Sequence, residues 1–88
     1  MPVLKTRIHE LRKERKMQQS DLAELVGVRR ETIGNLENGK YNPSLKLAMD
    51  IAKVFGKPVE YIFQFEEELH LLGYDDIRRK IIKKEQVL

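Results

Sequence analysis

Apolar residues recur at helical spacing in five short segments of the chain, with polar residues between them. The first segment holds Ile8 and Leu11 in a charged stretch that ends near Lys16. Four more segments follow, at about residues 19–26, 29–38, 45–55 and 58–63. An apolar residue at every third or fourth position is typical of a helix with one buried face. The pattern therefore predicts an all-α domain of five short helices around one core.

Turn-forming residues separate these segments and indicate where each helix ends. Gly27, Asn38-Gly39 and Gly56 follow apolar segments, as helix-ending residues do, and Asn42-Pro43 cannot continue a helix. Ser44 is a good N-cap, and Pro58 suits the first position of a short helix. The fourth segment is expected to be the central and most buried helix, because it carries the widest apolar stripe: Leu45, Leu47, Ala48, Ile51, Ala52, Val54 and Phe55.

The stretch Gln19 to Leu36 joins two of these helices at a tight turn. Gly27 stands where the first helix must stop in a left-handed conformation, and Ala23 stands where the second helix must cross close to the first. Two helices that share an apolar face across such a turn form the helix-turn-helix of DNA-binding proteins. The sequence therefore predicts that the chain binds duplex DNA.

The second helix of this motif carries a polar face that suits the edges of bases. Arg30 precedes Gly34 by four positions, so it projects over a site without a side chain, and its fork matches the two acceptors of guanine. Asn35 can pair with adenine in the same bidentate way. Glu31 either accepts a hydrogen bond from cytosine or holds Arg30 or Lys40 in place. The alternative for each residue is an exposed polar position without a ligand.

Composition excludes several classes of function. The chain has 88 residues, enough for one small core, and it has no cysteine, so disulfides, thiolate metal sites and cysteine nucleophiles are excluded. His9 and His70 are far apart in sequence, so we expect no metal and no cofactor. The chain shows neither a serine elbow nor a phosphate loop, so we expect no enzyme and no small-molecule substrate. It also lacks a membrane span and a signal peptide, which favours a cytoplasmic protein.

Charge is distributed unevenly along the chain. Residues 1–65 hold 12 Lys and Arg against 8 Asp and Glu, a net of +4, whereas residues 66–88 hold 5 against 6, a net of −1. The positive excess therefore lies with the helix-turn-helix, as contacts with phosphates require. Alone, a net charge of this size is also ordinary for a soluble protein.

Residues 66–88 differ in character from the rest and are read as a C-terminal extension. An acidic run, Glu66 to Glu68, precedes a leucine-rich stretch, and Ile77 and Ile81 are spaced for a final amphipathic helix. Such a helix is too short to be stable alone. Its basic residues either contact DNA or form the solvated face of a helix that docks on a partner, and we favour docking.

Residues 5–65 resemble the Cro/cI-type (Xre-type) helix-turn-helix repressor domain. The resemblance rests on Leu11-Arg12, Gln19, Leu22-Ala23, Gly27-Val28, Thr32-Ile33, Leu36-Glu37, Gly39-Lys40, Asn42-Pro43-Ser44 and Ile62-Phe63. It implies a five-helix, lambda-repressor-like bundle for residues 1–65. The ending Ile62-Phe63-Gln64-Phe65 is similar to short members in which a strand after the last helix pairs with the N-terminus. A small antiparallel sheet of residues 3–5 with 63–66 is therefore expected.

The resemblance also implies roles for individual residues. Base contacts would come from Arg30, Glu31 and Asn35, and phosphate contacts from Gln19, Lys40 and the backbone of Asn38 and Gly39. Arg12 and Glu37 correspond to an ion pair that ties the first helix to the end of the third.

Three positions depart from the family pattern. Gln18 and Arg29 replace the usual capping residues, and Arg29 is expected to reach a phosphate instead. Gly34 replaces a residue with a side chain, at a cost of about 1 kcal/mol against alanine.

The function implied is a sequence-specific transcriptional regulator, most simply a repressor, that binds a palindromic operator as a homodimer. The expected dimer interface consists of Tyr61, Phe63, Phe65, Leu69, Leu72, Ile77 and Ile81. Two alternatives stay open. One is an antitoxin-like or partner-binding module whose C-terminal tail holds another protein, and the other is a coactivator that bridges proteins with the same fold.

Overall fold

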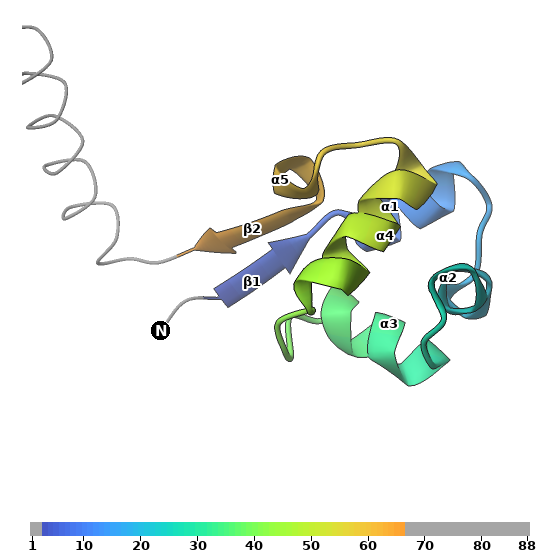
Figure 1. Cartoon of the computed structure of the whole chain (residues 1–88), viewed down its shortest axis with the longest axis horizontal. Helices are drawn as coiled ribbons and strands as arrows, with labels where there is room; N and C mark the ends of the chain where they lie inside the picture. The colour runs from blue at the N-terminus through green and yellow to red at the C-terminus, as the bar shows by residue number, and fades with distance from the viewer. Residues whose placement is uncertain (1–2, 67–88) are drawn as a thin grey trace, which may run out of the picture.

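The computed structural model describes residues 3–66, which form five helices and a two-stranded sheet (Figure 1). The elements in chain order are β1 (Val3–Thr6), α1 (Ile8–Glu14), α2 (Gln19–Val26), α3 (Arg30–Glu37), α4 (Leu45–Phe55), α5 (Val59–Ile62) and β2 (Phe63–Glu66). The five-helix bundle and the small sheet are therefore confirmed. The final helix expected around Ile77 and Ile81 lies outside the described residues, as do Leu69 and Leu72.

The helices end close to their predicted limits, with small differences at the termini. Helix α1 stops at Glu14 rather than near Lys16, because the chain turns there and the amide of Met17 donates back to the carbonyl of Arg12 at 2.9 Å. Pro58 precedes the first residue of α5 as its N-cap and is not inside the helix. Ser44 caps α4 as predicted, since its hydroxyl accepts from the amide of Leu47 at 3.1 Å.

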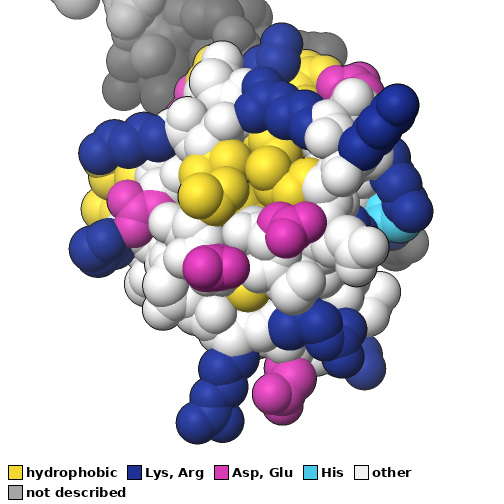
Figure 2. Space-filling model, turned by 90° about the vertical axis from the view of Figure 1, so that its right-hand side faces the viewer, with side chains coloured by type: hydrophobic (Ala, Val, Ile, Leu, Met, Phe, Trp, Pro, Cys, Tyr) yellow, Lys and Arg dark blue, Asp and Glu magenta, His cyan; other side chains and the backbone are white. Residues whose placement is uncertain are grey.

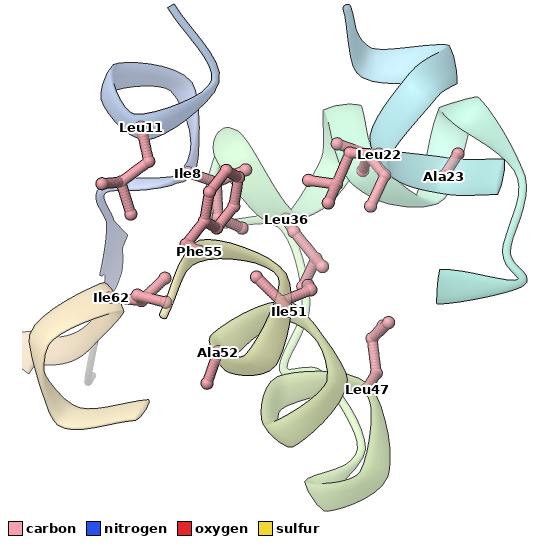
Figure 3. Packing of buried hydrophobic residues seen from close by; sticks show 11 residues of the cluster. Ile8, Leu11, Leu22, Ala23, Leu36, Leu47, Ile51, Ala52, Phe55 and Ile62 are labelled. Atoms are coloured by element: carbon pink, nitrogen blue, oxygen red, sulfur yellow. The ribbon is translucent and has the colours of Figure 1, made fainter. Parts of the chain in front are cut away.

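The core lies where all five helices meet (Figure 3). Ile51 and Phe55 of α4 stand at its centre, which confirms that α4 is the central helix. The remaining members of the buried cluster are Ile8, Leu11, Leu22, Ala23, Ile33, Leu36, Leu47, Ala52 and Ile62.

One residue of the predicted apolar stripe on α4 is not buried. The side chain of Leu45 is 74% exposed, because the buried face of the helix is centred on Ile51 and Phe55 and Leu45 lies at its border. Met49, one turn further along, is exposed on the same side. The prediction that Leu45 belongs to the core was therefore wrong.

The sheet joins the two ends of the described chain. Strands β1 and β2 are antiparallel, with Val3 opposite Glu66 and Leu4 opposite Phe65. Residues directly opposite in such a pair share one face of the sheet. Leu4 is buried, whereas Phe65 is 51% exposed, because the sheet extends beyond the helices (Figure 1).

The turn between α3 and α4 packs directly on strand β1. A Cβ atom at Gly39 would lie 2.5 Å from the carbonyl oxygen of Leu4, and the residue has a φ of +69°. Both the space and the backbone conformation therefore require glycine. This contact fixes the end of α3 against the sheet.

Helices α2 and α3 form the predicted helix-turn-helix. They pack against each other, and α2 lies on the side of the molecule away from the sheet (Figure 1). Gly27 has a φ of +72° between them, and Ala23 is buried, so the small side chain lets the two helices approach. The outer face of α3 is thereby left uncovered.

Candidate nucleic-acid interface

The outer face of α3 presents the polar side chains that were predicted to contact DNA. Arg30, Glu31 and Asn35 are all exposed along one side of the helix. Arg29 and Asn38 are exposed at its two ends, and Lys40 is exposed just beyond it; Arg29 makes no side-chain hydrogen bond with the start of the helix. The structure thus brings all six side chains to the surface around α3, and their contacts with a ligand stay predictions.

Figure 2 shows the side of the molecule on which α2 lies. Lys and Arg side chains stand out along the lower edge, where α3 lies in Figure 1, with an acidic side chain between them. An apolar area occupies the middle of this side, with charged side chains at its rim. Leu25 of α2 is 62% exposed and is the most exposed apolar residue of that helix.

An ion pair fixes the C-terminal end of α3, on the side opposite its outer face. The guanidinium of Arg12 meets the carboxylate of Glu37 in a bidentate arrangement, with Nε to Oε2 at 2.6 Å and Nη2 to Oε1 at 3.0 Å. Arg12 is only 5% exposed, and its Nη1 also donates to the carbonyl of Met17 at 2.9 Å. The pair expected from the family resemblance is present, and it ties α1, the α1–α2 turn and α3 together.

The ion pair also sets the protonation state of Glu37. Burial of the carboxyl group raises its pKa, and the hydrogen bonds from Arg12 and Gln19 lower it. Together with the positive charge of Arg12 they hold the pKa of Glu37 below its ordinary value. The exposed ring of His9 lies beside the pair, with Nδ1 at 3.1 Å from Nη2 of Arg12. Glu37 is therefore an anion at neutral pH.

Gln19 connects this buried pair to the outer face of α3. Its Nε2 donates to Oε1 of Glu37 at 3.1 Å, and its Oε1 accepts from Nη1 of Arg30 at 2.9 Å. A Cβ atom at Gly34 would lie 3.7 Å from the same Oε1, so the amide lies over the glycine. The space at Gly34, which we expected to admit a base pair, is thus partly occupied by the side chain of Gln19.

This link was missed by the sequence reasoning, which assigned Gln19 only a phosphate contact. The two roles are compatible, because a carboxamide has two N–H donors and only one is used among residues 3–66. Glu31, in contrast, has no ion pair with Arg30 or Lys40 in the described part of the chain. Arg30 is held by Gln19 instead.

The N-terminus of α2 is better capped than Gln18 alone suggested. The carboxylate of Asp21 accepts from the amide of Gln18 at 2.9 Å. This is one half of a capping box, and the spacing of three residues between an N-cap and an acidic residue is its signal in sequence. The expected loss at this terminus is therefore partly offset.

The three aromatic residues expected at a dimer interface differ in their exposure. Phe63 is half-buried and packs against the core. Tyr61 is 40% exposed, with Arg7 at 4.3 Å and Lys57 at 5.5 Å from its ring centroid. Phe65 alone of the three exposes half of its side chain.

Two other kinds of feature are absent from residues 3–66. In that range no group of three His, Asp or Glu side chains is placed to hold a metal ion. None of the helices described there is long and apolar enough to cross a membrane.

Comparison with known proteins agrees with this geometry. Residues 8–62 match the helix-turn-helix family model. An uncharacterized HTH-type transcriptional regulator of Archaeoglobus fulgidus is 60% identical over 65 residues, which cover 74% of this chain and 92% of that protein. The immunity repressor protein of Bacillus phage phi105 is 39% identical over 56 residues, which cover 64% of this chain and 39% of the repressor.

A solved structure shows the same arrangement of helices. The P22 c2 repressor, crystallised in complex with synthetic operator 9T in the presence of Tl+, is similar with a TM-score of 0.60 and 27% identity, over 62% of this chain and 83% of that one. The chain belongs to the helix-turn-helix family, in its Cro/cI (Xre) type, and is a DNA-binding transcriptional regulator rather than an enzyme.

Proposed function

We propose that the chain is a sequence-specific repressor that reads the major groove of duplex DNA with α3 and acts as a homodimer. One observation carries this proposal: the C-terminal end of α3 is fixed by the Arg12–Glu37 pair, while the outer face of the helix stays exposed. A helix held in this way can enter the groove without changing its orientation. The similarity to a phage immunity repressor and to the P22 c2 repressor supports repression. Because its target is DNA, we place the protein in the cytoplasm.

Base contacts are assigned to Arg30, Asn35 and Glu31. The hydrogen bond from Arg30 to Gln19 holds the guanidinium in a defined position before DNA arrives. A side chain ordered in advance loses less conformational entropy on binding. Arg30 is therefore our first candidate for guanine, with Asn35 for adenine and Glu31 for the amino group of cytosine.

Phosphate contacts are assigned to the ends of the two helices. Gln19 begins α2 and offers its second N–H, while Arg29 stands at the start of α3. Asn38 and Lys40 follow the end of α3. Contacts to phosphates fix the register of the protein on DNA and carry no sequence information directly.

The two kinds of contact can be separated by mutation. A preferred site is first selected from a pool of random duplexes at a stated salt concentration. Arg30→Ala and Asn35→Ala should each weaken binding to that site by about 1–3 kcal/mol and leave binding to unrelated duplexes nearly unchanged. Lys40→Ala should weaken binding to every duplex and reduce the salt slope by about one unit. Equal profiles for Arg30→Ala and Lys40→Ala would contradict the assignment.

The homodimer follows from the small reach of one recognition helix. Two copies related by a two-fold axis would place their α3 helices about 34 Å apart, one turn of DNA. Phe65 is an exposed aromatic residue on the sheet, and the apolar residues Leu69, Leu72, Ile77 and Ile81 follow it in sequence. We therefore assign the interface to β2, Tyr61 and residues 67–88.

Sedimentation of matched variants tests this interface. Phe65→Ala should weaken the dimer at micromolar concentration, whereas Leu25→Ala, which removes an even more exposed apolar side chain from α2, should not. Truncation after Glu66 should also weaken dimerisation and operator binding together. A full-length protein that sediments as a monomer while it binds its operator tightly would contradict the dimer but not the reading of DNA by α3.

A further inference from the structure

A cleft of about 610 Å³ opens between the end of α1 and the start of α2 and α3. Four cationic side chains line it, and no carboxylate does. They are Arg12, Lys13, Lys16 and Arg30. Its remaining lining is polar apart from Met17, so the cleft has the chemistry of an anion site.

Two of the four positive charges are already engaged. Arg12 is neutralised by Glu37, and Arg30 is held by Gln19. Lys13 and Lys16 are exposed, and within residues 3–66 neither has a carboxylate oxygen within 4.0 Å. Lys13 and Lys16 therefore bring two positive charges to the cleft that no ion pair within residues 3–66 neutralises.

The backbone at Lys16 is an independent sign of function. Helices α1, α2, α3 and α4 all end in the same hydrogen-bonded turn, in which a residue one or two positions past the helix adopts a left-handed conformation. Glycine fills this position in three of them, at Gly27, Gly39 and Gly56. At the end of α1 the position holds Lys16, with a φ of +53°. A side chain there strains the backbone, and such strain gathers at functional sites.

The cleft adjoins the face of α3 to which the base contacts were assigned. Arg30 belongs both to the wall of the cleft and to the exposed face of α3. A DNA strand whose bases meet that face must carry its phosphates past one end of the helix. The cleft at this end is where a phosphodiester would lie.

We propose that Lys13 and Lys16 bind backbone phosphate of duplex DNA in this cleft, so that the contact surface extends from α3 onto the α1–α2 turn. The proposal rests on the DNA binding proposed above. It adds two residues to the phosphate contacts that were predicted from the sequence. Because phosphate contacts are independent of sequence, any duplex of sufficient length serves as the probe.

The experiment measures affinity for a generic duplex between about 50 and 200 mM salt. Lys13→Ala and Lys16→Gly should each flatten the plot of log affinity against log salt by about 0.9, which makes the loss of affinity over that range about 3-fold to 4-fold smaller. Lys16→Arg, which keeps the charge, should retain the slope. Lys53→Ala is the matched control, because Lys53 is an exposed lysine in the last turn of α4 and lies outside the cleft.

Stability should change in the opposite direction for Lys16→Gly. Relief of the left-handed strain is expected to raise the Tm by about 3–6 °C, so weaker binding could not be attributed to unfolding. A salt slope unchanged by both Lys13→Ala and Lys16→Gly would overturn the proposal. A second result would also overturn it: inorganic phosphate raises the Tm of the wild type but not of Lys16→Gly, while the salt slope of DNA binding is the same for both. The cleft would then bind a free anion and not the DNA backbone. A wild-type chain that binds no duplex would instead overturn the proposed function.

Discussion

The two ends of α3 are held in opposite ways. At its C-terminal end, Glu37 is buried and bonded to Arg12 and Gln19, and Gly39 packs on strand β1. At its N-terminal end, the helix begins at Arg30, the N-cap residue Arg29 makes no side-chain cap, and Arg30 and Glu31 are exposed. One end thus fixes the orientation of the helix, while the other leaves its side chains available to a ligand.

The largest effect should come from breaking the fixed end. Glu37→Ala leaves the buried guanidinium of Arg12 without its partner, and loss of one member of such a pair costs about 3–5 kcal/mol of unfolding free energy. Glu31→Ala, at the exposed end, should change stability by less than about 0.5 kcal/mol. Urea denaturation of both variants makes the comparison. Similar values for the two would show that the ends of α3 are not held differently.

Acid should weaken the fixed end selectively. Because the pKa of Glu37 is lowered in the folded protein, its contribution to stability is complete above the ordinary glutamate pKa of about 4.3 and is lost as the pH falls through that value toward the lowered one. The difference in unfolding free energy between the wild type and Glu37→Gln should therefore shrink from neutral pH to about pH 3. A difference that stays constant over this range would contradict the lowered pKa.

Gln19→Ala should sharpen the comparison, because it removes the link between the two ends. Glu37 keeps Arg12, so the loss of stability should be only about 1 kcal/mol. Arg30 loses its support, so binding to a selected site should weaken as well. Gln18→Ala, one position earlier, keeps the backbone bond to Asp21 and should affect neither property strongly. Thermal unfolding and DNA titration of the two variants are the measurements.

The smallest effect is expected at Gly34. A Cβ there would make ordinary contacts of 3.7 and 3.8 Å with the Gln19 amide, so alanine fits. Gly34→Ala should therefore stabilise the protein by up to about 1 kcal/mol through helix propensity. Its Tm should rise while the slope of DNA binding against salt stays the same. A fall in Tm would show that the amide cannot accommodate the methyl group.

The sequence predicted the helices well, because Gly27, Gly56, Ser44 and Pro58 act within one turn of the chain. The prediction for Leu45 failed because helical spacing alone does not show where the buried face of α4 is centred. That centre depends on the neighbours of the helix in the fold. The prediction of the sheet came from resemblance to a family and not from an alternation of apolar and polar residues. The Arg30–Gln19–Glu37 connection was not predictable, since it depends on how three helices lie against one another.

The pairing of Val3 with Glu66 bears on how the chain reaches its fold. This contact closes nearly the whole described chain into one loop, and the entropy lost in closing a loop grows with its length. Contacts between α2 and α3 lie much closer in sequence, and such contacts form sooner. The helix-turn-helix is therefore expected to assemble early and the strands to join last. In hydrogen exchange, the amides of the sheet should open at a lower free energy than those of α4. The part of the protein assigned to DNA would then be finished before the two ends of the domain meet.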